Sequence, residues 1–338
     1  MRVYGGIDLH SSNGYLGLID ESDQWVCQRR LPNELPAYLE SLAPYREQLV
    51  GVVVESTFNW YWLVDGLLDE GYRVHLVNPA AIVPYRGLKY SDDRIDSRWL
   101  GHLLRVGVVP ESYIYPKEKR GLRDLMRKRI TLVRQRTANV LSLLNVYQRS
   151  LGVRLTAKDQ RELTEPMIEQ AFSDANVVRS ACAMLRLVRF LEGEIAELEA
   201  SVRSQLQPDP ALKILKSTPG IGEVLAPTIL LETGSISRFA SAGKYASYCR
   251  TVSSTRLSND KPKGSGNRKN GNAYLAWAFV EAANFAIRYS PQIRRYYERK
   301  KAKTQRVVAV KTVAHKLARA CYYMLRDQVP FEIDKAFG

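Results

Sequence analysis

Residues 2–8 read Arg-Val-Tyr-Gly-Gly-Ile-Asp, an apolar run that ends in the carboxylate of Asp8. Residues 50–54 form a second run, short and rich in valine, and Glu55 follows it directly. Runs of this kind are typical of strands that are buried on both faces of a sheet. The pattern therefore predicts two central strands, each with an acidic side chain at the point where the strand ends.

The segments around these two runs predict the rest of an α/β domain. Residues 14–20 and 24–30 alternate as a hairpin, with Glu21-Ser22-Asp23 as its turn. The order of strands and helices is β-β-β-α-β-α-β-α, which favours a mixed sheet with helices on its faces, as in the ribonuclease-H-like fold. The remaining predicted elements are helices at 32–45, 59–70 and 91–106 and a strand at 73–77.

The character of the chain changes near residue 117, where long helical patterns begin. Residues 117–150 and 175–206 each repeat apolar side chains every three to four positions, as in a coiled-coil seam. Gln207-Pro208-Asp209-Pro210 interrupts the second pattern, and a mostly helical segment follows. We predict three parts: a catalytic α/β domain at 1–112, a coiled-coil helical region for dimerisation at 113–207, and a helical C-terminal domain at 208–338. The two long helices of the middle part could form an antiparallel hairpin within one chain or a coiled coil between subunits.

The composition of the chain indicates which partners it can bind and where it is expected in the cell. The 338 residues carry a formal net charge of +15, which favours nucleic acid or an anionic membrane surface. No apolar run reaches the length of a membrane-spanning helix, and the N-terminus enters a strand pattern without a signal peptide. The four cysteines are scattered and lack metal-binding spacing. We therefore expect a cytoplasmic protein rather than a membrane protein.

The acidic residues of the first hundred positions form a candidate metal site. Asp93 and Asp96 share a helix face at i, i+3, and Asp92 and Asp96 do so at i, i+4, so spacing alone does not choose between Asp92 and Asp93. Together with Asp8 and Glu55 they offer hard oxygen ligands for magnesium or manganese. Two such ions can act on a phosphodiester. The alternative is that the helix acids only favour a helix N-terminus.

Two further segments indicate contact with nucleic acid. Residues 219–222, Pro-Gly-Ile-Gly, resemble the turn of a helix-hairpin-helix element, although an ordinary turn between helices fits equally well. Residues 245–272 are basic and rich in serine, which suits a loop that closes on a phosphate backbone. The candidate nucleic-acid-binding residues are Arg123, Arg127, Lys128, Gly220, Gly222, Arg256, Lys261, Lys263, Arg268, Lys269, Arg299, Lys300 and Lys301.

Seven short motifs, in this order, resemble one known family across nearly the whole chain. They are Gly6-Ile7-Asp8, Val54-Glu55-Ser56-Thr57, Val77-Asn78-Pro79, Lys89 with Asp93-Arg94-Ile95-Asp96-Ser97, Thr218-Pro219-Gly220-Ile221-Gly222, Leu257-Ser258-Asn259 and Lys269-Asn270-Gly271-Asn272. The family is that of the DEDD-type insertion-sequence transposases, which include the pilin-gene inverting recombinase and the bridge-RNA-guided recombinases.

The resemblance implies a site and a mechanism. It implies a RuvC-like fold and magnesium site, and the family's acid pair followed by alanine or serine selects Asp93 with Asp96. It also implies a nucleophilic serine, matched here by Ser258, with Asn259 in the place where the family commonly has glycine. Ser253 and Ser254 are lesser candidates. The implied activity is strand exchange between donor and target DNA.

The same resemblance implies a protein of a bacterial or archaeal cell that is associated with the nucleoid, and it implies partners. They are a structured non-coding guide RNA and further copies of the chain, as a dimer or tetramer held by the coiled-coil segment, with the acidic site of one copy meeting the serine loop of another. Two other classes of function remain open: a metal-dependent structure-specific nuclease in which Ser258 is only a contact, and a nucleic-acid-binding scaffold without catalysis. A tyrosine recombinase is less favoured, because the chain has only four histidines and the nearest match to the His/Arg set of that class is the segment from His315 to Arg319.

Overall fold

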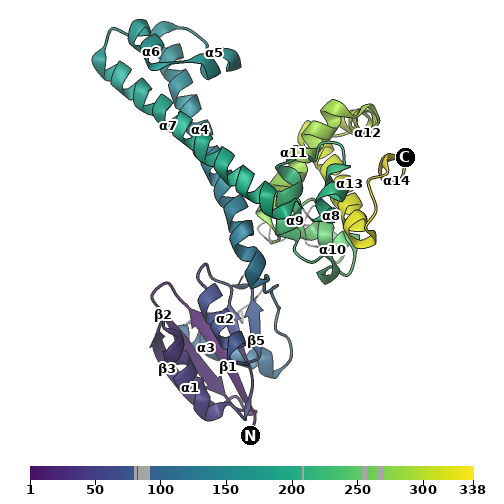
Figure 1. Ribbon diagram of the computed structural model, residues 1–338. Coiled ribbons are helices and arrows are strands. Elements are labelled where there is room, and N and C mark those ends of the chain that lie inside the picture. Colours follow the sequence, from purple (N-terminus) through teal and green to yellow (C-terminus); the bar gives the residue numbers. More distant parts are fainter. Residues whose placement is uncertain (80–81, 83–91, 208, 253–256, 265–269) are drawn as a thin grey trace. The chain divides into compact units, whose positions relative to one another are not determined.

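The computed structural model describes residues 1–338 except 80–81, 83–91, 208, 253–256 and 265–269, and for Leu257, Ser258 and Pro262 it describes the backbone. The chain divides into two compact units, Met1–Lys117 and Glu118–Gly338 (Figure 1). Each unit is described here by itself. Among the described residues, no helix combines the length and the apolar character needed to cross a membrane.

Unit 1 is built on a five-stranded mixed sheet, which confirms the α/β layout predicted from the sequence. The strand order is β3-β2-β1-β4-β5; β2 is antiparallel to both of its neighbours, β1 and β3, whereas β1, β4 and β5 are parallel. The predicted hairpin is present, because β2 and β3 pair along their whole length. The strands are β1 Val3–Leu9, β2 Asn13–Ile19, β3 Trp25–Pro32, β4 Leu49–Glu55 and β5 Val74–Val77.

Helices cover both faces of this sheet. The helices α1 (Leu35–Leu42) and α2 (Tyr61–Asp69) bury their apolar side chains with Ile7, Val52 and Val54, on one face. The helix α3 (Asp93–Arg105) packs on the other face, where Leu100 contacts Val53 and Val77. Because side chains alternate along a strand, Asp8 and Glu55 project toward the face that α3 covers. A short 3-10 helix, η1, spans Ala43–Tyr45.

Small residues let α3 approach the sheet closely. A Cβ atom on Gly6 would lie 2.0 Å from the carbonyl oxygen of Ser97 and 2.8 Å from the backbone nitrogen of Gly101. Ser97 is fully buried, and its hydroxyl donates to the carbonyl oxygen of Arg94 at 2.9 Å. A larger side chain at either Gly6 or Ser97 would separate the helix from β1. This contact therefore sets how near α3 brings its acids to Asp8.

A second contact fixes α3 to the β2–β3 turn. Asp23 lies in this turn with a φ of 59° and accepts two hydrogen bonds from Arg105, at 2.7 and 2.6 Å. The imidazole of His102 lies 3.0 Å from the same carboxylate. Although burial opposes it, these partners lower the pKa of Asp23 below its ordinary value. The turn and the last part of α3 are thus joined by charge as well as by packing.

Unit 2 contains a long antiparallel helical pair. The helices α4 (Lys117–Leu151) and α7 (Ala175–Leu206) run in opposite directions, since Met126 shares a core with Val202 while Val146 shares one with Cys182. Arg129 donates to Glu199 at 2.8 Å across the pair. The short helices α5 (Ala157–Glu162) and α6 (Glu165–Ala171) lie between them in the chain. The two long helices agree with the helical patterns predicted for 117–150 and 175–206.

The rest of unit 2 is a helical domain around its own core. Its largest buried side chains, Tyr245 and Phe279, pack with their rings 6.2 Å apart. Figure 1 shows α8 to α14 gathered at one end of the long helical pair. The elements are α8 Pro210–Lys216, α9 Leu225–Thr233, η3 Ile236–Arg238, α10 Ala242–Tyr248, β6 Leu257–Ser258, β7 Lys261–Pro262, α11 Ala273–Tyr289, α12 Pro291–Lys301, α13 Arg306–Asp327 and α14 Ile333–Phe337.

Candidate metal centre and serine hairpin

Asp8 lies at the centre of an acidic cluster in unit 1. It is 6% exposed and follows Ile7 on β1, while Glu55 follows Val54, the register partner of Ile7, on β4. Parallel strands end at the same edge of a sheet, so the two carboxylates come together there. Burial raises the pKa of Asp8 to about 6, the charges of Asp96 and Asp93 raise it further, and His10 opposes the rise.

Glu55 shares this electrostatic environment. Burial is the largest cause that raises its pKa to about 7, and the charges of Asp8 and Asp96 add to the effect. Both carboxyl groups therefore hold protons more tightly than isolated carboxyl groups do, first because burial disfavours their charged forms and second because the neighbouring acids repel them. A cation placed among them would remove this repulsion.

The structure gives Asp92 and Asp93 different positions. Asp92 is the N-cap residue of α3, in an extended conformation, and its side chain accepts a hydrogen bond from the backbone nitrogen of Ile95 at 2.9 Å. Asp93 is the first residue of the helix, and its Oδ1 atom lies 3.8 Å from Nε2 of His10. Asp93 thus faces the cluster, while Asp92 supports the helix end. Capping by a side-chain oxygen explains the acid at position 92 without a ligand.

His10 is a member of the cluster that the sequence analysis did not identify. Its Nε2 atom lies 3.5 Å from Oδ2 of Asp8, and its backbone carbonyl accepts hydrogen bonds from the side chains of Asn33 and Asn59 at 3.0 and 2.9 Å. Possible ligand atoms of Asp8, His10 and Asp93 lie within 4.8 Å of one another. The available signal was the spacing Asp8-x-His10, which places both side chains on one face of an extended chain.

This donor set fits a divalent metal ion. Asp8, His10 and Asp93 have possible ligand atoms close enough to share one ion, and the charges of Glu55 and Asp96 act on the same site. Carboxylate oxygens are the donors that magnesium and manganese prefer, and a histidine nitrogen suits manganese better than magnesium. Burial is the main cause of the raised pKa values of Asp8 and Glu55, and repulsion by the neighbouring carboxylates adds to it. The arrangement is chemically able to bind a cation beside a phosphate group.

In unit 2, Ser258 occupies a tight hairpin. It is the last residue of β6 and pairs with Lys261 of β7. The two residues between them, Asn259 and Asp260, have φ angles of 49° and 57°, as a type I′ turn requires. Glycine adopts positive φ angles without steric strain, and asparagine tolerates them better than most other residues do. The backbone thus gives a physical reason why Asn259 can stand where the family commonly has glycine.

The two ends of the segment that carries Ser258 are fixed beside each other. The backbone nitrogen of Asn272 donates to the carbonyl oxygen of Tyr248 at 2.7 Å. Arg250 donates to the carbonyl oxygens of Asn270 and Gly271 at 3.1 and 2.8 Å. Gly271 has a φ of 88°, and a Cβ atom there would lie 2.4 Å from the carbonyl oxygen of Tyr248. Asn270 and Gly271 of the predicted motif therefore lie at the base of this loop, where hydrogen bonds join its two ends.

A buried ion pair connects this loop base to α4. Arg127 donates to both carboxylate oxygens of Glu232, at 2.6 and 2.8 Å, and the Glu232 side chain is 2% exposed. The side chain of Asn272 donates to the same carboxylate at 2.6 Å. Burial works against the charged form of Arg127, but the hydrogen bonds and charge of Glu232 raise its pKa. Arg127 was a candidate for nucleic-acid binding, and here its guanidinium is engaged with the protein.

The Pro-Gly-Ile-Gly segment forms a turn between α8 and α9. Ile221 donates its backbone nitrogen to the carbonyl oxygen of Thr218, with Gly220 at a φ of 87° after Pro219, which defines a type II turn. A Cβ atom on Gly220 would lie 2.3 Å from the carbonyl oxygen of Ala282, so this glycine permits contact with α11. Gly222 is exposed, with open space around it.

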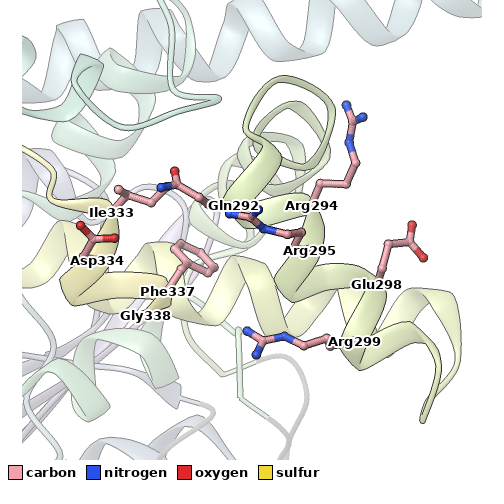
Figure 2. Close-up of a pocket in the computed structure, with 9 residues that line it drawn as sticks. All are labelled: Gln292, Arg294, Arg295, Glu298, Arg299, Ile333, Asp334, Phe337 and Gly338. Carbon is pink, nitrogen blue, oxygen red and sulfur yellow. The ribbon is translucent and has the colours of Figure 1, made fainter.

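The other candidate nucleic-acid-binding residues lie in several places. Figure 2 shows Arg295 and Arg299 of α12 on the same side as Phe337 of α14, around a cavity of about 650 Å³ that Arg294 and Glu298 also line. Arg123 is largely buried on α4, with 11% of its side chain exposed. Lys128, Lys261, Lys263, Arg299, Lys300 and Lys301 are exposed. Arg256, Arg268 and Lys269, together with Lys89, Ser253 and Ser254, lie outside the described residues.

Comparison with known families agrees with the motifs. A family model described as transposase, of the DEDD type named for IS110, matches residues 5–149. A second, described as the transposase IS116/IS110/IS902 family, matches residues 212–298. Together the two cover more than half of the chain, including both the acidic cluster and the segment with Ser258. The chain belongs to the IS110-type family of DEDD transposases.

Individual relatives from two insertion elements match part of this chain at 29% and 30% identity. The chain is 29% identical over 136 residues to an uncharacterised 43.6 kDa protein of insertion element IS110 from Streptomyces coelicolor, covering 40% of this chain and 34% of the relative. It is 30% identical over 149 residues to an uncharacterised 42 kDa protein of insertion element IS900 from Mycobacterium paratuberculosis, covering 43% and 37%. The chain therefore spans little more than a third of the length of these relatives.

Proposed function

We propose that this chain is a DNA recombinase of the transposase type that exchanges strands between donor and target DNA. The observation that supports this most strongly is the convergence of Asp8, Glu55, Asp93 and Asp96 from two parallel strands and one helix. The strand order and the position of these acids support a RuvC-like domain. The same acids are the proposed ligands of Mg²⁺, with Mn²⁺ as an alternative.

The proposed chemistry is a phosphoryl transfer to Ser258. The bond between Oγ of Ser258 and phosphorus forms while the bond from phosphorus to the strand's O3′ breaks, and the proton lost from the serine is balanced by the proton gained by the 3′-hydroxyl. A divalent ion held by the carboxylates supplies Lewis-acid stabilisation of the charge on the transferring phosphate. A 3′-hydroxyl of the second DNA reverses the step, so that the phosphodiester energy is conserved.

The partners and assembly follow the same proposal. A structured non-coding RNA guides the choice of donor and target, and the formal net charge of +15 suits such polyanions. The α4–α7 pair joins copies of the chain into a dimer or tetramer, in which the carboxylates of one copy act with Ser258 of another. The three-part division at residues 112 and 207 assigns these tasks to a catalytic domain, a dimerisation region and a serine-bearing domain.

The first test is mass spectrometry of the full chain after incubation with Mg²⁺, the non-coding RNA that flanks its gene, and nicked matching donor and target DNA. A nucleotide remnant on Ser258 is the expected result, and it should be missing from Ser258→Ala. Cut DNA with free ends and no adduct would instead identify a metal-dependent nuclease. RNA-independent products would remove the guide RNA from the proposal.

A matched pair of variants tests the acidic site. Asp93→Asn should abolish strand exchange, because it removes a proposed ligand beside Asp8 and His10. Asp92→Asn should keep it, because asparagine also caps a helix N-terminus and Asp92 bonds to the backbone of Ile95. Equal loss in both variants would show that charge at the helix end, rather than a metal ligand, is what activity requires.

A further inference from the structure

We propose that α11 carries a binding site for unpaired nucleobases, formed by the rings of Phe285 and Tyr289. The two residues are spaced i, i+4 on the helix, and their ring planes lie only 7° apart with centroids separated by 6.4 Å. They are 43% and 65% exposed, although large aromatic side chains usually bury their rings. The pair therefore presents two nearly parallel aromatic rings that are largely accessible to solvent.

The charges beside this pair determine the kind of ligand. The guanidinium of Arg288 lies 5.5 Å from the ring centroid of Tyr289. Arg288, Arg294 and Arg306 line a neighbouring hollow of about 440 Å³, with Glu298 as the acidic residue among its lining. Aromatic rings next to arginines fit a single nucleic-acid strand, whose bases stack on rings while its phosphates meet the cations.

The arginines are held in different ways, which makes their roles separable. Arg294 donates from Nε to the carbonyl oxygen of Ile287 at 3.0 Å and from Nη2 to that of Arg288, so it also stabilises the end of α11. Arg306 is exposed at the first turn of α13. Arg306 is therefore the residue whose loss tests a phosphate contact without disturbing the helix end.

The turn at 218–221 adjoins the same surface. Gly220 packs against Ala282 and Ala286, and these alanines lie three residues before Phe285 and Tyr289 on one side of α11. Gly222 is exposed in this turn, with nothing within 4 Å of the position of a Cβ atom. A strand lying on the aromatic pair would thus pass close to open backbone. The inference rests on the proposed function for its choice of a nucleic acid, but it requires no catalysis.

The test is fluorescence anisotropy of the full chain with a labelled single-stranded 20-mer of deoxythymidine and with a 20-base-pair duplex, in EDTA. The double variant Phe285→Ala/Tyr289→Ala should bind the single strand about 5- to 150-fold more weakly, as expected for the loss of stacking on one base. Its binding of duplex should change less than about twofold. Phe285→Leu/Tyr289→Leu should be as weak as the alanine variant, because leucine keeps apolar surface but offers no planar ring.

Salt dependence separates stacking from charge. The aromatic variants should leave the slope of log affinity against log salt unchanged, whereas Arg306→Gln should lower its magnitude by about 0.7. Tyr323→Ala serves as the matched control, since Tyr323 is 41% exposed on α13 but contacts Tyr322 and Arg326 instead.

Three outcomes would overturn the inference: unchanged binding of the single strand, equal losses for strand and duplex, or full rescue by leucine with a change in oligomeric state. The last of these would identify a second copy of the chain as the occupant. Because the assay contains no Mg²⁺ and measures no strand exchange, its failure is distinguishable from failure of the proposed recombinase activity.

Discussion

Replacing Gly6 by alanine tests whether the contact between α3 and β1 sets the geometry of the acidic site. The new Cβ atom would lie 2.0 Å from the carbonyl oxygen of Ser97, whereas ordinary contact begins at 3.4 Å. Because the new Cβ atom and the carbonyl oxygen of Ser97 are both fixed to the backbone, only a shift of α3 away from the sheet by about 1.4 Å would relieve the clash. Overpacking of this kind costs roughly 1–3 kcal/mol and sometimes more, so we expect Gly6→Ala to lower the free energy of unfolding by about 3 kcal/mol.

Gly5→Ala is the matched control in the same strand. Its Cβ atom would lie 3.2 Å from side-chain carbons of Leu18 and Val52, which can shift, so the expected loss is below about 1 kcal/mol. Urea unfolding followed by tryptophan fluorescence measures both variants in unit 1, which holds four of the five tryptophans: Trp25, Trp60, Trp62 and Trp99. Equal midpoints for the two variants would refute the reasoning. Calorimetric titration should also show weaker Mg²⁺ binding by Gly6→Ala than by Gly5→Ala.

Three further predictions follow from other contacts. Glu232→Gln should lower stability by roughly 3 kcal/mol, measured by urea unfolding followed by circular dichroism, because it leaves the charge of Arg127 without its buried partner; an unchanged midpoint would contradict this. Folding raises the pKa of Asp8 to about 6 and of Glu55 to about 7, so these groups should make the metal-free protein less stable as pH rises from about 4 to 7, and Mg²⁺ should reverse the loss at the upper end. Urea unfolding midpoints at pH 5 and 7.5 measure this effect, with an Asp8→Asn/Glu55→Gln variant for comparison. A midpoint that rises with pH in the metal-free protein would contradict the prediction. Asn259→Gly should retain strand exchange while Asn259→Val loses most of it, because β-branched residues resist the φ of 49°. Similar product yields from the two variants would show that strand exchange does not depend on this turn conformation.

The parts of the fold that the sequence predicted well are those determined by local patterns. The apolar runs that end at Asp8 and Glu55 are strands because burial on both faces requires continuous apolar residues. Their acids come together because the two strands are parallel and end at one edge. The predicted hairpin and the long helices α4 and α7 likewise follow from alternation and helical spacing.

The parts that the sequence left open depend on contacts between distant residues or on backbone conformation. Spacing could not separate Asp92 from Asp93, because the difference is whether the residue lies before the helix or inside it. Arg127 was counted with the basic surface, since nothing near it in the chain reveals a partner at Glu232. His10 was missed because a single histidine carries little information until Asp93 is placed beside it.

The acidic cluster also has a consequence for how copies of this gene change with time. Acids at positions 8 and 55 that hold protons so strongly work against the stability of their own domain whenever no cation is bound. Under the proposed function, a neutral amide at either position would relieve the repulsion, so a gene copy no longer under selection for strand exchange would gain stability by replacing these acids. We expect inactive copies to accumulate asparagine or glutamine at these positions early, and intact carboxylates to mark copies whose activity is still under selection.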